Sequence, residues 1–285
     1  MQFSKLTDSF GAETHDANLA QLDDAMFGEL WEAWKQHHVL VIRGQKLTAP
    51  QFHAWATRLG RPEPHVIDQF HHKDIADILI LSNVKHRGQP IGLQDAGTYF
   101  HTDYSYLAVP ARATTLYSIT VPAAGGATRF ADQQAAYDDL SADMKRTVEP
   151  LIGRHRYGNR DDLDVASRTV ASVLNQEQDK KMDWVKHRVA RPNPVNGKKA
   201  LYSISGSAFG IYGMPDKEAV ELLDQLKAHS TQPRYLLDVH YGVGDVVLWD
   251  NAALLHAATL INLAHQRTLW RITVKEDPAH LEVFH

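Results

Sequence analysis

The chain has 285 residues, of which 44% are apolar and 22% charged, and its formal net charge is −4 at pH 7. These values are ordinary for a globular protein and give no general attraction to nucleic acid or to anionic membranes. The lack of cysteine excludes disulfides, thiolate zinc sites, iron–sulfur clusters and cysteine nucleophiles. The first ten residues do not resemble a secretory leader, and no apolar run approaches about 18 residues, so we expect a cytoplasmic protein without a membrane span.

The first third of the chain alternates helices and short strands. Apolar residues at helical spacing predict a helix over Leu22 to His37, and an apolar strand follows at Val39 to Ile42. Thr48 and the glutamine three residues later form a capping-box pattern, which opens a second helix over Gln51 to Leu59. Another apolar strand is predicted at Ile78 to Leu81.

From Tyr99 onward the pattern is mostly that of strands. Two helices interrupt it, near Gln133 to Glu149 and near Lys217 to Ala228. Gly242 to Asp245 is typical of a hairpin turn between the two strands beside it. Many short strands with inserted helices predict an α+β protein with a jelly-roll core. The strands are expected at Ala113 to Val121, Ala200 to Ile204, Tyr235 to Tyr241, Val246 to Trp249 and Thr268 to Val274.

No repeat or low-complexity linker divides the chain, so we expect a single domain over residues 1–285. The polar stretch from Arg154 to Asp183 has few strand signals, and it fits an active-site lid as well as a solvated loop. Phosphate-binding loops, HExxH zinc helices and the GxSxG nucleophile motif are all missing. Neither nucleotide binding nor serine hydrolysis is indicated.

The 17 histidines direct attention to metal chemistry. A non-haem Fe(II) oxygenase binds its metal through two imidazoles and one carboxylate and leaves three positions open. A His-x-Asp triplet on a strand supplies two of these ligands from one face, and a distant strand supplies the third. The triplets are His72 to Asp74 and His101 to Asp103. The first is interpreted as a surface histidine beside an aspartate, whereas the second precedes the clear strand at Ala113 to Val121.

Two further features accompany His101. His256 follows an apolar strand much later in the chain and can be either the third ligand or a core histidine. In the last strand, Arg267 and Arg271 share one face with Leu269 and Thr273, about 13 Å apart at roughly 3.3 Å per residue. If that face points into a barrel, each guanidinium needs an anion, because a buried unpaired charge is very costly.

Together these segments resemble the TauD/TfdA family of Fe(II)/2-oxoglutarate-dependent dioxygenases over nearly the whole chain. The resemblance rests on His101-Thr102-Asp103, on Pro122 to Thr128, and on Trp249-Asp250-Asn251 ahead of His256, with Arg267 and Arg271 following. It implies a double-stranded β-helix core and an enzyme that uses Fe(II), 2-oxoglutarate and O₂. The expected reaction oxidises, most simply hydroxylates, a C–H bond of a small substrate and releases succinate and CO₂.

The resemblance also implies roles for individual residues. His101, Asp103 and His256 would bind Fe(II), and Thr128 and Arg267 would hold the distal carboxylate of 2-oxoglutarate. Arg271 would meet an anionic group of the substrate, whether carboxylate, sulfonate or phosphonate. The other substrate-binding candidates are His65, Tyr104 and Phe209.

Gly97 departs from the family pattern near a position where the taurine enzyme carries a substrate-binding asparagine, which argues against taurine itself. Two other readings stay open: a catalytically silent jelly-roll binding or sensor protein, and a redox-inert metal hydrolase on the same fold. The expected partner is a small molecule rather than nucleic acid or membrane. Self-association into a homo-oligomer is compatible with the resemblance, although no interface can be identified in the sequence.

Overall fold

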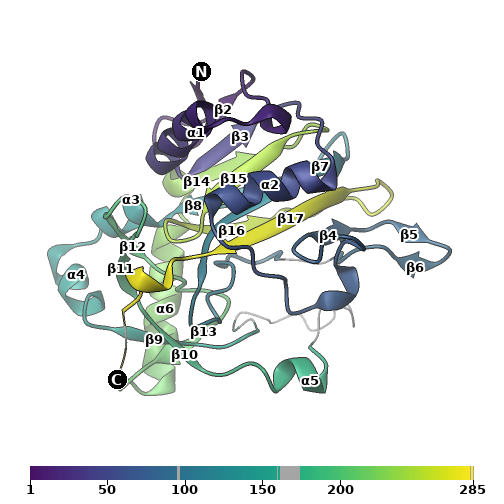
Figure 1. Ribbon diagram of the computed structural model, residues 1–285. Coiled ribbons are helices and arrows are strands. Elements are labelled where there is room, and N and C mark those ends of the chain that lie inside the picture. Colours follow the sequence, from purple (N-terminus) through teal and green to yellow (C-terminus); the bar gives the residue numbers. More distant parts are fainter. Residues whose placement is uncertain (95–96, 159, 161–173, 283, 285) are drawn as a thin grey trace.

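The computed structural model describes residues 1–94, 97–158, 160, 174–282 and 284. Its centre is a seven-stranded sheet in the order β1-β2-β3-β15-β7-β17-β4 (Figure 1). A three-stranded sheet, β14-β8-β16, packs against one face of it. The large sheet contains β1 (Ser4–Lys5), β2 (Ala12–Thr14), β3 (Val39–Ile42), β4 (Leu79–Ser82), β7 (Ala111–Thr120), β15 (Val246–Asp250) and β17 (Thr268–Lys275). The small sheet contains β8 (Thr128–Asp132), β14 (Leu236–Val239) and β16 (Leu254–Ala258).

The remaining elements surround these two sheets. The helices are α1 (Asp24–His37), α2 (Ala49–Leu59), α3 (Gln133–Asp138), α4 (Ala142–Val148), α5 (Gln176–Asp179) and α6 (Asp216–Ser230). The 3₁₀ turns are Leu19–Gln21, Asp68–Phe70, Pro233–Tyr235 and Pro278–His280. The outlying strands are β5 (Lys85–His86), β6 (Gln89–Pro90), β9 (Ile152–His155), β10 (Val185–Arg188), β11 (Ala190–Pro192), β12 (Lys199–Leu201) and β13 (Ala208–Ile211). No helix among the described residues is long and apolar enough to cross a membrane.

Alternation along the strands of the large sheet separates two apolar cores. In β3, Leu40 and Ile42 pack into the core beneath α1 and α2, whereas Val39 and Val41 face the small sheet. The side chains of β17 alternate between the two faces in the same way, and Ile272 lies on the face that packs against the helices. Side chains on a strand alternate between its two faces, so Arg271 must lie on the side that faces the small sheet. The expected arrangement of the last strand is therefore confirmed, and its arginine face points inward.

Most predicted elements are present, and two differ in instructive ways. The helix expected over Gln133 to Glu149 is two helices, because Ser141 starts a new one by accepting a hydrogen bond from the backbone N–H of Met144. The expected strand at Ala200 to Ile204 is only β12, which ends at Leu201. The capping box of Thr48 and Gln51 is formed as predicted.

The predicted hairpin at Gly242 to Asp245 is wrong. Strand β14 pairs with β8 in the small sheet, whereas β15 pairs with β3 and β7 in the large one, so the turn crosses between sheets. Asp245 fixes this crossing by accepting hydrogen bonds from the backbone N–H groups of Gly242 and Gly44 and by pairing with Arg43 at 2.6 Å. A local turn signal cannot reveal that its two strands belong to different sheets, because the deciding partners are distant in sequence.

Candidate active site

Three side chains converge between the two sheets. The Nε2 atom of His101 and the Nε2 atom of His256 each lie 3.6 Å from a different carboxylate oxygen of Asp103. One donor atom from each of the three residues lies within 4.8 Å of the other two, and the two imidazole rings are 4.2 Å apart. Two imidazoles and one carboxylate form the ligand set typical of a non-haem Fe(II) centre.

Backbone pairing brings the distant ligands together. The N–H of His101 donates to the carbonyl of His256, and the N–H of His256 donates back, both at 2.9 Å. His256 lies inside β16, so the third candidate ligand comes from a strand that is distant in sequence. The strand expected at His101 to Asp103 is wrong: His101 forms an isolated bridge, and a turn begins at Asp103. The side chain of Asn251 holds this turn by accepting the backbone N–H of Asp103 at 3.3 Å.

The protonation of these groups suits a cation. His101 Nδ1 lies 2.8 Å from the carbonyl oxygen of Tyr99, so Nδ1 carries the proton and Nε2 keeps its lone pair for a metal. Burial, and then His101, lowers the pKa of His256 to about 3, which keeps this imidazole neutral. Burial alone would raise the pKa of Asp103, but Arg271 and the two histidines outweigh it and hold that pKa well below its usual value. His256 Nδ1 is buried and has no hydrogen-bond partner among the described residues.

Arg271 lies directly beside this cluster. Its Nη2 atom is 3.0 Å from Asp103 Oδ1, and its guanidinium lies 5.5 Å from the centre of the Tyr104 ring. The residue is only 8% exposed, and Asp103 raises the pKa of its guanidinium against the opposing effect of burial. The ring of His65 packs at a tilt against Tyr104, with 5.9 Å between the ring centres, and burial, followed by the nearby Arg271, lowers the pKa of His65 to about 3. Arg271, Tyr104 and a neutral His65 therefore form one corner of the site.

Arg267 and Thr128 form another part of the same cavity wall. Ten residues line this cavity: Leu81, Gly97, His101, Leu116, Thr128, Trp249, His256, Ala258, Arg267 and Arg271. Burial lowers the pKa of Arg267, and its Nε is buried without an acceptor among the described residues. Thr128 shares a hydrogen bond of 2.5 Å with the hydroxyl of Tyr241, whose ring lies 5.9 Å from the Arg267 guanidinium carbon. A cation and a hydroxyl on one wall suit a carboxylate ligand.

The structure does not place every predicted residue here. Phe209 lies on β13 with its ring edge against Trp184, and it is not among the described residues that line the cavity. His72 packs its ring edge-on against Trp270, and its Nδ1 accepts the backbone N–H of Asp74, as expected for a histidine outside the site. Much of the predicted lid at Arg154 to Asp183, residues 161–173, lies outside the described residues, so the lid stays a prediction.

Residues that the sequence interpretation missed include Tyr241, Thr114 and Asn251. Thr114 Oγ1 lies 2.6 Å from Asp103 Oδ2, and Asn251 contacts both of these residues. Thr114 lies within a predicted strand, where a threonine is the expected residue type. Asn251 was visible only as part of the Trp249-Asp250-Asn251 segment. Nothing in either local pattern signals a contact with Asp103.

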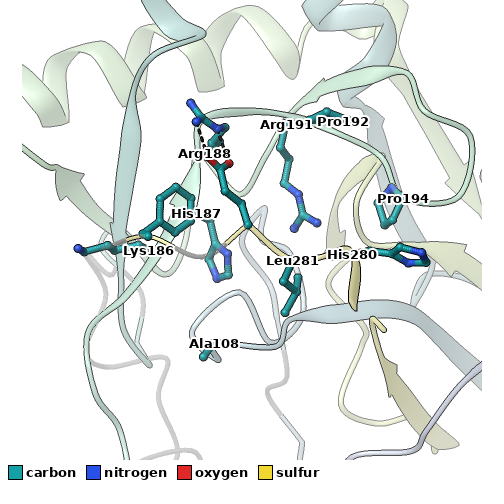
Figure 2. Close-up of a pocket in the computed structure, with 11 residues that line it drawn as sticks. Ala108, Lys186, His187, Arg188, Arg191, Pro192, Pro194, His280 and Leu281 are labelled. Atoms are coloured by element: carbon teal, nitrogen blue, oxygen red, sulfur yellow. Dashed lines mark hydrogen bonds and ion pairs between the residues drawn. The ribbon is translucent and has the colours of Figure 1, made fainter. Parts of the chain in front are cut away.

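A second cavity, of about 300 Å³, is much larger than the one of about 40 Å³ beside Asp103. Figure 2 shows it between the β10–β11 region and the C-terminal segment, lined by Lys186, His187, Arg188, Arg191, Leu281 and others. Its two arginines are already paired, Arg188 with Glu282 and Arg191 with the buried Glu276. Of these two cavities, the smaller is the one lined by the converging imidazoles and by Arg267, which has no acid partner within the described part of the chain, so we place the chemistry there.

The comparisons with known proteins agree with this geometry. The family model described as "Taurine catabolism dioxygenase TauD, TfdA family" matches residues 2–273. The chain belongs to the TauD/TfdA family. It is 30% identical to the (S)-phenoxypropionate/alpha-ketoglutarate-dioxygenase of Sphingobium herbicidovorans, over 95% of this chain and 93% of the relative. It is 33% identical to the alpha-ketoglutarate-dependent 2,4-dichlorophenoxyacetate dioxygenase of a Burkholderia species, over 84% and 82%.

Solved structures extend the TauD/TfdA assignment to the fold. The crystal structure of AAD-2 in complex with Mn(II) and N-oxalylglycine matches with a TM-score of 0.80 at 27% identity, over 96% of this chain and 98% of that one. A taurine dioxygenase from Burkholderia xenovorans matches with a TM-score of 0.80 at 26% identity, over 97% and 89%. The protein is therefore a dioxygenase that uses Fe(II), 2-oxoglutarate and O₂, with the cupin-like core expected from its sequence, and it acts on a small molecule.

Gly97 has a structural role beside the candidate metal ligands. Its φ is +70°, and a Cβ at this position would lie 2.3 Å from Cε1 of His101. We expect Gly97→Ala to displace the imidazole and to weaken Mn(II) binding, measured by calorimetry, by at least about tenfold, as does the loss of a group that orients a metal ligand. Gly213→Ala is the matched control, because Gly213 has a φ of +77° but a Cβ there would meet no atom within 4 Å. That control should lose about 1–2 kcal/mol of stability from backbone strain and keep its Mn(II) affinity. Equal affinities in the two variants would contradict the steric role of Gly97.

Proposed function

We propose that the enzyme hydroxylates a C–H bond of a small, singly charged anionic molecule, most simply a carboxylate. In this proposal His101, Asp103 and His256 bind Fe(II), Thr128 and Arg267 bind the distal carboxylate of 2-oxoglutarate, and Arg271 binds the anionic group of the substrate. The converging donor atoms of the first three residues support the first assignment, and the buried Nε of Arg267, which has no acceptor among the described residues, supports the second. The bound metal with 2-oxoglutarate and O₂ supplies the oxidising power, and the co-substrate leaves as succinate and CO₂.

The burial of Arg271 beside Asp103 is the observation that carries the choice of substrate. Fe(II) brings two positive charges, and Arg267 and Arg271 bring one each; Asp103 contributes one negative charge and 2-oxoglutarate two. One positive charge remains in a water-poor site, where an uncompensated charge is costly. A monoanionic substrate paired with Arg271 completes the balance. The names of two relatives support the same class, because phenoxypropionate and 2,4-dichlorophenoxyacetate are both aryloxy carboxylates.

The residues around Arg271 suit a carboxylate attached to an apolar body. Ile67 donates its backbone N–H to His65 Nδ1 at 3.1 Å, so a neutral His65 carries its proton on Nε2 and can donate it to an anion. Tyr104 and Tyr106 pack edge to face at 5.7 Å, and Tyr157 packs on Tyr106 at 4.9 Å. Such aromatic faces bind flat apolar groups. In this proposal Arg271 and His65 orient the substrate by its charged end, and the tyrosines exclude water from its apolar part.

The proposal predicts a strict requirement for negative charge. With Fe(II), 2-oxoglutarate and O₂ supplied, aryloxyalkanoic acids should stimulate succinate release, whereas their primary amides of nearly the same shape should not. Loss of one partner of a buried charge pair costs about 2–5 kcal/mol, so kcat/KM for the amide should be at least about thirtyfold lower. Alkanesulfonates of matched size test whether the site accepts other monoanions. Equal turnover of an acid and its amide would show that Arg271 does not select for charge.

A further inference from the structure

A second layer of buried polar groups lies behind the candidate metal ligands. Thr114 on β7 and Asn251 just after β15 are at most 1% exposed. Thr114 Oγ1 lies 2.6 Å from Asp103 Oδ2, and Asn251 Nδ2 lies 3.0 Å from Thr114 Oγ1. These contacts connect the Trp249-Asp250-Asn251 segment to the carboxylate of Asp103, a connection that the ligand assignment alone does not use.

The direction of each hydrogen bond in this layer can be deduced. Asn251 Oδ1 faces the backbone N–H of Asp103 at 3.3 Å and the indole Nε1 of Trp249 at 3.2 Å. Both of those groups can only donate, so this side of the amide must be the oxygen. The NH₂ side of Asn251 therefore faces Thr114 and donates to its hydroxyl oxygen.

The Thr114 hydroxyl has a single proton, and among its described neighbours the only acceptor that requires it is the carboxylate of Asp103. Asp103, which pairs with Arg271, is an ionised carboxylate and can only accept, so Thr114 donates to its Oδ2 atom. The hydroxyl of Thr273 lies 3.2 Å from Thr114 and receives the Nε–H of Arg271 at 3.1 Å, and it also hydrogen-bonds the phenol oxygen of Tyr104, so Thr273 does not need the proton of Thr114. Asn251, Thr114 and Asp103 thus each have a consistent donor or acceptor role.

We propose that Thr114 is a positioning residue for the metal-ligating carboxylate, with its hydroxyl proton directed at Asp103 by Asn251. A charge-assisted hydrogen bond of this length fixes the rotation of the carboxylate and occupies lone-pair density on one of its oxygens. The arrangement presents Asp103 to the metal in one orientation before the metal arrives. This inference rests on the proposed function, because it assumes that Asp103 is a metal ligand.

The test is Mn(II) affinity, measured by calorimetry on protein stripped of metal with a chelator. Thr114→Val keeps the shape of the side chain but removes the donor, and it should raise the dissociation constant for Mn(II) at least about tenfold, as does the loss of other groups that orient metal ligands. Thr114→Ser restores the donor and should bind Mn(II) within about threefold of the natural protein. A purely structural threonine would lower the melting temperature of the valine variant without this difference in affinity. If the valine variant does not fold, Thr114→Ala removes the same donor and replaces it in the comparison.

The outcomes separate this inference from the proposed ligand set. Mn(II) binding that Asp103→Ala abolishes but Thr114→Val leaves unchanged would overturn the role of Thr114 and keep the ligands. Mn(II) binding that survives in Asp103→Ala, or no binding by the natural protein, would overturn both. A weakened valine variant whose affinity the serine variant does not recover would show that the hydroxyl is not the important group, which also overturns the inference.

Discussion

Replacing His101 by alanine is expected to abolish the coloured complex that the enzyme forms with Fe(II) and 2-oxoglutarate under anaerobic conditions, together with all succinate release. In the proposed ligand set, His101 would offer Nε2 to the metal, because its Nδ1–H is held by the carbonyl of Tyr99. Losing a ligand should cost more than the roughly 10–100-fold in metal affinity that follows from losing a group behind a ligand. The measurement is a titration of metal-free protein, followed through the weak visible charge-transfer band of the chelate.

His72→Ala is the matched control for this experiment, because His72 begins the other His-x-Asp triplet of the sequence. Its ring packs against Trp270 at 5.4 Å on the helix side of the large sheet, so the band and the turnover should be retained. If His72→Ala lost the band and the turnover while His101→Ala kept both, the assignment of the ligands would be overturned. The change at His101 is preferred to one at Asp103, because removing Asp103 also leaves the buried Arg271 without its partner.

The contrast between the two triplets shows what the sequence could predict about the site. Residue types and spacing identified His101, Asp103, His256 and both arginines as candidates, and the structure brings these residues together. The local geometry was predicted less well: His101 is held by a single bridge to His256 rather than by a strand. That bridge depends on β16, which is about 150 residues away, and no periodicity near His101 encodes it. Phe209 was proposed from its residue type alone, and its place on β13 beside Trp184 separates it from the cavity lining.

The strands of the fold also differ in how well the local sequence predicts them. Strands with a buried partner on each side, such as β3 and β15, have continuous apolar sequences and were located almost to the residue. Strands β8 and β16 were not predicted, because each is short and contains polar residues, among them Thr128 and His256, which line the cavity. Residues that line the cavity therefore contribute to the weak strand pattern of these two segments. Likewise, the crossing at Gly242 to Asp245 depends on Arg43 and Gly44, which the local turn pattern does not include.

Replacing Arg267 by methionine is expected to raise the KM for 2-oxoglutarate at least about thirtyfold, since truncating one member of a buried charge pair costs about 2–5 kcal/mol. The same change should not lower the melting temperature of the ligand-free protein. Arg267 Nε is buried without an acceptor among the described residues, and burial lowers the pKa of the guanidinium, so the charge is unfavourable until an anion binds. Succinate release as a function of 2-oxoglutarate concentration, together with a thermal melt, measures both effects.

Arg271→Met is the matched comparison, because it removes a guanidinium from the same face of the same strand. Arg271 already has a partner, so its loss leaves Asp103 buried and unpaired and should destabilise the ligand-free protein by about 3–5 kcal/mol. Its kinetic effect should fall on the KM for the anionic substrate and leave that for 2-oxoglutarate nearly unchanged. If Arg271→Met instead raises the KM for 2-oxoglutarate and Arg267→Met does not, the two arginines exchange roles. The melting temperatures of the two ligand-free variants do not depend on which ligand each arginine binds. They depend only on whether the guanidinium already has an anionic partner, as Arg271 has in Asp103.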